Sequence, residues 1–146
     1  MDLEKAGLDD GDPKAMCELG ARYSTQVGIG LDRDDDKATF WYRKAAESGF
    51  VPAQHNYGVM LDRNGDHAGA LVWFEKAAEA GMPDAIHALG QLWHSGFHKN
   101  GRWVRDMPKA LTYYEKADAL GYLPAKRSLA QLQKDMARVG LSSSSP

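Results

Sequence analysis

Hydrophobic positions along this chain follow two alternating patterns, and both have the spacing of an amphipathic α-helix. In the first pattern, Ala, a large residue, Gly and a second large residue share one helical stripe. In the second, two neighbouring aromatic residues precede Lys-Ala, and a Gly stands four residues after that Ala. The patterns therefore predict two kinds of helix, here called A and B, that alternate along the sequence. The B segments are TFWYRKAAESG (39–49), LVWFEKAAEAG (71–81) and LTYYEKADALG (111–121).

Polar and special residues mark the ends of these helices. Asp12 and Pro13 suit the start of the first A helix, since Asp accepts from free N–H groups and Pro lacks the N–H that would be unpaired there. The same reasoning makes an Asp the N-cap of each B helix and a Gly its left-handed end. These residues are Asp34, Asp66 and Asp106 at the starts, and Gly49, Gly81 and Gly121 at the ends. Pro52, Pro83 and Pro124 fall in the first turns of the following A helices.

The unit recurs with the period of a helical-repeat array. Its boundary Gly stands at 11, 49, 81 and 121, which gives spacings of 38, 32 and 40 residues. We therefore expect an all-α fold of α-α type, with repeats over 11–49, 50–81 and 82–121 and a polar capping helix over 123–138. One domain would cover 1–140, Glu4-Lys5-Ala6 would end an earlier B helix, and 141–146 would be a disordered tail. The expected core is Leu19, Tyr23, Trp41, Tyr42, Tyr57, Trp73, Phe74, Leu89, Trp93, Tyr113, Tyr114 and Leu129.

The copies differ in the turn between helices A and B. This turn is long at 24–33, short at 62–65 and long again at 94–105, as expected of surface loops. In the third turn, Trp103 takes the position of Leu31 in the first, three residues before the capping Asp, and we expect it to pack inward. Phe97 has no counterpart; with Lys99 it is a candidate binding hot spot, an exposed aromatic in a basic loop.

Several short motifs are specific in combination. They are Leu19-Gly20, Gly28-Ile29-Gly30-Leu31, Asp34, Lys37-Ala38, Trp41-Tyr42 and Lys44-Ala45-Ala46-Glu47-Ser48-Gly49. In this register they closely resemble the Sel1-like repeat, a relative of the tetratricopeptide repeat. The resemblance extends from residue 11 to about 135. It implies a right-handed superhelix, or solenoid, of antiparallel helix pairs that acts as a scaffold or adaptor for other proteins in bacteria.

Composition narrows the range of functions. A formal charge of −2, with scattered Lys and Arg, argues against a nucleic-acid footprint, and no apolar run reaches the length of a membrane span. Cys17 is the single cysteine, so no disulfide within the chain is expected. With a polar, acidic start, this favours the cytoplasm, or the periplasm or exterior if a signal peptide has been removed. We expect a monomer or weak homodimer.

No catalytic constellation emerges. Gly28-Ile-Gly30 lacks a preceding strand and a third Gly, and the run Asp32–Asp36 lacks a calcium-loop frame. Ser142–Ser145 have no ordered base beside them, and Cys17 reads as a surface or half-buried thiol without special reactivity. We expect no enzyme activity, no cofactor and no metal.

Three columns of variable residues on the A helices predict a partner-binding groove. They are counted two, six and nine residues after each conserved Ala, where analogy with the tetratricopeptide repeat places the concave side. The predicted contacts are His55, Val59, Asp62, His87, Gln91, His94, Arg127, Gln131 and Lys134. The leading function is a non-enzymatic interaction scaffold. The alternatives are an immunity-type protein that neutralises a toxin, an assembly factor for a secretion or envelope complex and, remotely, a metal-dependent hydrolase using His55, His87 and His94.

Overall fold

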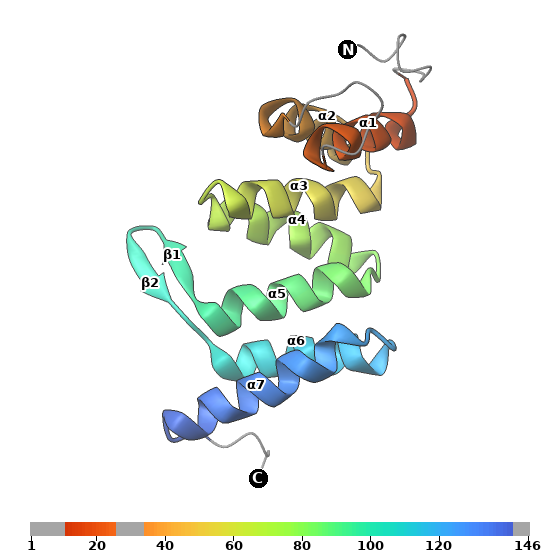
Figure 1. Ribbon diagram of the computed structural model, residues 1–146. Helices are drawn as coiled ribbons and strands as arrows, with labels where there is room; N and C mark the ends of the chain where they lie inside the picture. Colours follow the sequence, from red (N-terminus) through yellow and green to blue (C-terminus); the bar gives the residue numbers. More distant parts are fainter. Residues whose placement is uncertain (1–10, 26–33, 142–146) are drawn as a thin grey trace. The chain divides into compact units, whose positions relative to one another are not determined.

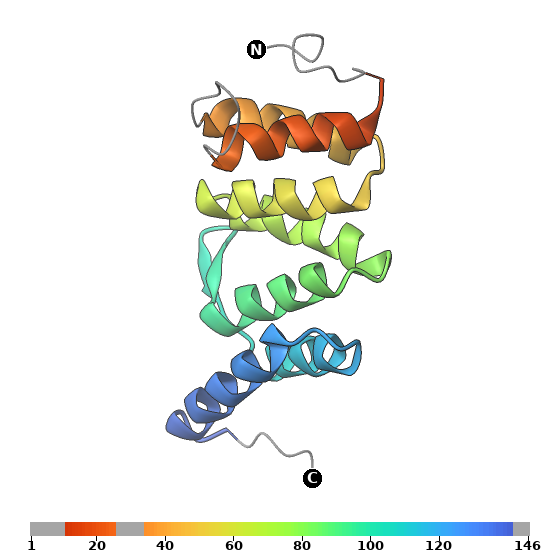
Figure 2. The same ribbon diagram turned by 45° about the vertical axis from the view of Figure 1, so that its right-hand side comes forward.

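The computed structural model describes residues 11–25 and 34–141, and this part consists of seven helices and one short hairpin (Figures 1 and 2). The expectations for Glu4-Lys5-Ala6, the turn at Gly28–Leu31, Asp32 and the serines of the tail lie outside the described residues. The elements in chain order are α1 (Pro13–Thr25), α2 (Asp35–Glu47), α3 (Val51–Arg63), α4 (His67–Glu79), α5 (Pro83–Ser95), β1 (Phe97–Lys99), β2 (Arg102–Val104), α6 (Met107–Ala119) and α7 (Pro124–Arg138).

The chain divides into two compact units, residues 1–76 and 77–146. In the first unit, α1 packs on α2 and α2 on α3. In the second, α5 packs on α6 and α6 on α7 (Figure 1). The alternation of A and B helices predicted from the sequence is therefore confirmed within each unit.

The helix ends use the residues that the sequence predicts. The Asp34 carboxylate accepts from the Lys37 N–H at 3.0 Å, and Asp106 accepts from the Lys109 N–H at 3.0 Å. Asp66 and Asp12 make the same kind of contact at α4 and α1. Gly49, Gly81 and Gly121 have φ of 89°, 89° and 84°, the left-handed region that favours glycine. The ends of these helices are therefore set by residues at the ends themselves, a capping Asp at the start and a left-handed Gly after the end.

Helices A and B approach closely because a glycine faces an aromatic ring. A Cβ built on Gly20 would lie 2.8 Å from the Tyr42 ring, and one on Gly90 would lie 2.5 Å from the Tyr114 ring. Gly58 faces Phe74 in the same way.

All twelve predicted core residues are at least partly buried. The fully buried ones are Leu19, Tyr23, Tyr42, Phe74, Leu89 and Tyr114; the half-buried ones are Trp41, Tyr57, Trp73, Trp93, Tyr113 and Leu129.

Helix α7 differs from the earlier A helices at one packing position. Ala130 stands where the earlier A helices carry a glycine, so its Cβ blocks an equally close approach by a further B helix. Lys126 and Gln133, beside it on the same face, are exposed. The polar outer face predicted for this helix is therefore present on its exposed side.

The third turn, for which the sequence analysis expected only a long surface loop, forms an antiparallel hairpin. Its strands pair Phe97 with Val104 and Lys99 with Arg102. The two residues between the strands, Asn100 and Gly101, have φ of 53° and 76°, as in a type I′ turn. Asn-Gly between short alternating runs is the strongest sequence signal for such a hairpin, and our sequence analysis did not use it.

The hairpin also reverses the expected roles of its two aromatic residues. Phe97 is 1% exposed and its ring meets that of Trp93 at 5.1 Å, so the prediction of an exposed Phe97 is wrong. Trp103 is 58% exposed, so the prediction that it packs inward is also wrong. The strand pairing explains the exchange. Phe97 pairs with Val104 and lies on the hairpin face that meets α5. Trp103 belongs to the next pair, with His98, and successive pairs point to opposite faces.

Candidate partner-binding face

In both units, two successive A helices are joined by a polar contact next to an aromatic ring of helix B. In the first unit, the Asn56 amide of α3 donates to the Cys17 sulfur of α1 at 3.7 Å. In the second, His87 Nε2 of α5 and Ser128 Oγ of α7 share a hydrogen bond of 2.7 Å. In both pairs, the first residue stands two positions after the conserved Ala of its own A helix. Its partner stands three positions after the conserved Ala of the next A helix. This column connects A helices within each unit.

These contacts bury His87 and Cys17 more deeply than the sequence predicted. His87 is 7% exposed, between the rings of Tyr114 and Tyr122, so it is not a groove residue open to a partner. Burial lowers the pKa of His87 because the charged imidazolium loses hydration. Cys17 is buried, where a surface or half-buried thiol was expected, and burial raises the pKa of its thiol. A buried thiol with a raised pKa has little thiolate with which to react.

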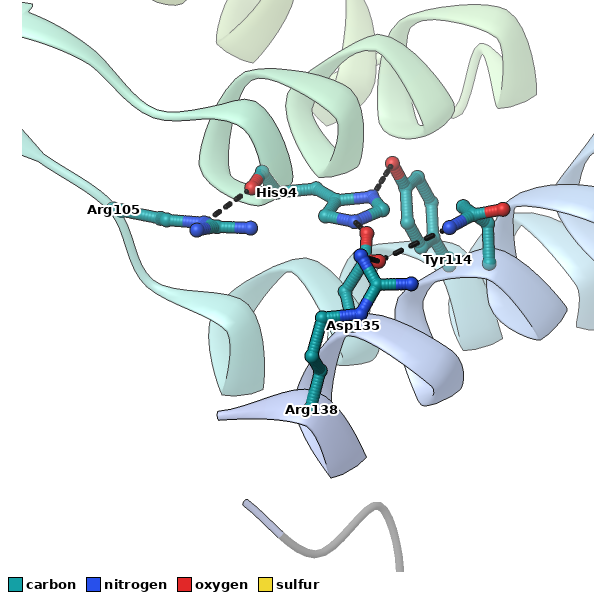
Figure 3. Close-up of polar contacts among 6 residues, drawn as sticks. His94, Arg105, Tyr114, Asp135 and Arg138 are labelled. Atoms are coloured by element: carbon teal, nitrogen blue, oxygen red, sulfur yellow. Dashed lines mark hydrogen bonds and ion pairs between the residues drawn. The ribbon is translucent and has the colours of Figure 1, made fainter. Parts of the chain in front are cut away.

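A second set of contacts joins three helices around His94 (Figure 3). Its Nε2 lies 2.7 Å from Asp135 Oδ2 of α7, and its Nδ1 lies 3.1 Å from the Tyr114 hydroxyl of α6. The hydrogen bond from His94 lowers the pKa of Asp135, whereas burial raises that of Tyr114 to about 12. Because Tyr114 keeps its proton, we assign its O–H as donor to Nδ1, and Nε2–H as donor to the carboxylate.

This cluster has the three types of group of a catalytic triad, but a substrate could not reach them. The Tyr114 side chain, where a nucleophile would stand, is 1% exposed, and its raised pKa keeps the hydroxyl protonated. The His94 side chain is 13% exposed, with both ring nitrogens engaged. The cluster therefore fixes α5, α6 and α7 relative to one another. Within residues 11–25 and 34–141, no group of three or more His, Cys, Asp or Glu side chains is placed to hold a metal ion.

The first unit carries the counterpart of this cluster in reduced form. Ser24, in the column of His94, lies with its hydroxyl 3.3 Å from that of Tyr42. In the second repeat the ring is Phe74, which has no hydroxyl, and Asp62 of that column instead contacts His67 Nδ1 at 2.6 Å. Asp62, predicted for the groove, is thus engaged within the chain. His55 and Val59 are half-buried, and the His55 ring lies 5.7 Å from that of Phe74.

The remaining predicted groove residues are exposed and lie together on the second unit. Gln91 is on α5 between its two contacts with α7, and Gln131 is on α7 between its two contacts with α5. On α7, Arg127, Gln131, Lys134 and Arg138 follow at i, i+4, i+7 and i+11, so they share one stripe. We call this surface the α5–α7 face; it consists of Gln91, Arg127, Gln131, Lys134 and Arg138.

The α5–α7 face is basic. It carries three cations, and the neighbouring carboxylate, Asp135, is already bonded to His94 and to the Gln131 amide. The Arg138 guanidinium lies 3.8 Å from Asp135 but is otherwise exposed. The stripe extends for about 16 Å, at about 1.5 Å per helical residue. It matches the length of about five residues of an extended peptide at about 3.3 Å each. Sequence analysis missed Ser128 and Asp135 because their role depends on which helices lie side by side.

Comparison with known proteins agrees with this architecture. The Sel1 repeat model matches residues 13–50, 51–82 and 83–122. A Sel1 repeat protein from Oxalobacter formigenes is 38% identical over 90% of this chain and 96% of its own, with a TM-score of 0.64. A protective antigen of uropathogenic Escherichia coli, which displays an SLR fold, is 28% identical with a TM-score of 0.72. The match covers 98% of this chain but only 30% of the antigen.

Other comparisons add little about function. An immunity protein from Pseudomonas aeruginosa is 21% identical with a TM-score of 0.45, a likeness too weak to carry an argument. No curated protein matches the chain. In the described residues, no helix has the length and apolar character needed to cross a membrane. Sel1 repeats generally mediate protein interactions as non-enzymatic scaffolds. Three consecutive repeat matches and an all-α helical-repeat solenoid fold show that this chain belongs to the Sel1 repeat family.

Proposed function

We propose that this protein is a non-enzymatic interaction module whose α5–α7 face binds an acidic segment of a peptide or protein partner. The observation that carries the proposal is the basic stripe on α7, next to exposed Gln91 on α5. Arg127 and Lys134 are exposed and have no acidic partner in the described part of the chain. The connector residues beside them fix the two helices, so the face is formed before a partner arrives, which lowers the entropic cost of binding.

The internal contacts support binding rather than catalysis. Hydrogen bonds between helices engage the titratable groups His87, His94, Tyr114 and Asp135 of this unit. A protein-interaction role needs only a shaped and charged surface, which the α5–α7 face offers. The lone, buried Cys17 is compatible with a reducing compartment, so a cytosolic location forms part of the proposal. We expect a monomer or weak homodimer, to be measured by light scattering.

A photo-crosslinking experiment tests the function. A benzoylphenylalanine replaces Gln131 on the face or, as control, Glu115 on the exposed side of α6, and each protein is irradiated in extract of its native cells. We expect a discrete adduct from position 131 only. In that protein, Arg127→Glu should remove the adduct because it reverses the charge of the stripe. Lys126→Glu, the neighbouring exposed cation on the helix face of Ala130, should leave it unchanged.

Two results would count against the proposal. Equal adducts from positions 131 and 115 would show that labelling does not depend on the face. An adduct from position 131 that survives Arg127→Glu would show that the basic stripe does not contribute to recognition.

A further inference from the structure

The β1–β2 hairpin concentrates positive charge in a chain that is acidic overall. Between Phe97 and Arg105 the sequence is FHKNGRWVR, with three Lys or Arg residues and no Asp or Glu, although the formal net charge of the chain is −2. Lys99 and Arg102 are directly opposite each other across the strand pair. Like charges in this arrangement are destabilising. In the described part of the chain, neither side chain has an ion pair that would relieve the repulsion.

The hairpin is held firmly at its base. Phe97 is buried against Trp93 at the end of α5, and the Asp106 N–H donates to the Trp93 carbonyl at 3.1 Å. The Arg105 Nε donates to the His94 carbonyl at 2.8 Å (Figure 3). Both strands are thus tied to the C-terminal end of α5. These contacts hold the hairpin, and with it the outward-facing side chains, in a fixed position relative to α5.

Trp103 is the large apolar side chain on the outer side of this hairpin. Its indole covers Gly96, where a Cβ would lie 2.5 Å from Trp103 Cζ2, and meets the His98 ring edge-on at 5.1 Å. The remaining 58% of the residue is exposed. Because the ring already packs on one side, little side-chain entropy remains to be lost on binding. Trp and Arg are the residue types most enriched among the side chains that dominate binding energy.

We propose that the hairpin is a second docking surface, on which Trp103 and the Lys99–Arg102 pair bind an acidic segment of another polypeptide. A carboxylate between Lys99 and Arg102 would replace their repulsion with two attractive contacts, while an apolar side chain of the same segment covers the exposed indole. The pairing register places Lys99 and Arg102 on one side of the hairpin and Trp103 on the other, so the bound segment wraps across the strand β2.

A protein segment suits this surface better than a lipid bilayer. Trp103 is the only apolar side chain of the hairpin that is more than half exposed, because Phe97 is buried and Val104 is half-buried. Membrane anchoring by surface insertion requires a larger apolar area than one indole provides. This surface consists of residues other than those of the α5–α7 face, and the proposal holds whether or not that face binds a partner.

The test uses the full chain and an eight-residue peptide of alternating Glu and Leu with a fluorescein label. Binding is followed by fluorescence anisotropy and by the indole N–H signal of Trp103 in NMR, which Trp103→Ala identifies. We expect saturable binding that Arg102→Glu weakens at least tenfold and Trp103→Ala at least fivefold. Lys116→Glu on α6 and Phe40→Ala on α2 are the matched controls, since both residues are exposed; neither should change the affinity.

Each alternative outcome has a separate meaning. Binding that is lost in Arg127→Glu but kept in Arg102→Glu would overturn this proposal and leave the α5–α7 face supported. Absence of peptide binding at millimolar concentration would overturn it as well. A shift of the Trp103 signal with phosphatidylserine vesicles but not with the peptide would assign the hairpin to membranes instead. Equal binding of a Lys-Leu peptide would show that charge plays no part and would also overturn the proposal.

Discussion

Replacing Gly90 by Ala tests the closest helix contact of the second unit. In an isolated helix this change is favourable, by about 1 kcal/mol of helix propensity. Here the added Cβ would lie 2.5 Å from two carbons of the Tyr114 ring, nearly 1 Å inside ordinary contact. The ring is fully buried, so it has no free space into which to turn. The structure therefore predicts that the substitution destabilises the protein.

The magnitude follows from the two opposing effects. Overpacking of this kind costs about 1–3 kcal/mol, and the short distance to a fixed ring favours the upper half of the range. Subtracting about 1 kcal/mol of helix propensity leaves a net loss of about 1–2 kcal/mol in the free energy of unfolding. At the corresponding position in α7, Ala130 is exposed. Ala130→Gly should also destabilise, by about 1 kcal/mol, because there only propensity changes.

Urea denaturation followed by circular dichroism measures both effects. The cycle of Gly90→Ala, Tyr114→Leu and the double variant isolates the contact itself. With Leu at 114 the ring atoms are gone, so Gly90→Ala should become neutral or stabilising, with a coupling of about 1–3 kcal/mol. If Gly90→Ala raises stability with Tyr114 present, the steric explanation is wrong. If its cost is unchanged with Leu at 114, the ring is not its cause.

Three further predictions concern buried groups. Burial lowers the pKa of His87, so as the pH falls the unfolded chain takes up a proton there before the folded chain does. The free energy of unfolding should therefore decline below about pH 6.5, by at most about 1.4 kcal/mol per pH unit for this group. Urea midpoints of the His87→Gln variant should decline less steeply over the same pH range. Tyr114→Phe leaves His94 Nδ1 without its donor, and the urea midpoint should report a loss of about 0.5–1.5 kcal/mol; a stabilised variant would contradict the assigned hydrogen bond. Phe97→Ala should cost about 3–5 kcal/mol because the ring is buried, whereas Trp103→Ala should cost far less, and similar costs for the two would refute the hairpin register.

The fold was largely predictable because its signals are local. Capping Asp residues, left-handed Gly residues and paired Gly and aromatic positions recur in every repeat, so each repeat supports the reading of the others. The hairpin was missed because repeat periodicity led us to treat the third turn as a variable loop, although Asn100-Gly101 signals a tight turn on its own. With the register unknown, the inward positions of Phe97 and Trp103 were assigned the wrong way round.

The candidate face was predicted only in part. The sequence located variable columns on the A helices, and for Gln91, Arg127, Gln131 and Lys134 exposure agrees with that prediction. For His87 and His94 the prediction of an exposed groove position was wrong. A variable column does not reveal whether a side chain faces solvent or the next helix. Their partners, Ser128 and Asp135, are 41 residues further along the chain in each case.

The sequence by itself therefore determined the helices, their ends and the family, since each depends on short-range spacing and backbone preference. The tertiary structure decided which polar residues are engaged in contacts between helices and which are exposed. It also decided that the exposed aromatic of the hairpin is Trp103. Those outcomes depend on distances between segments that are remote in sequence. The spacing of residues along one helix or strand does not determine such distances.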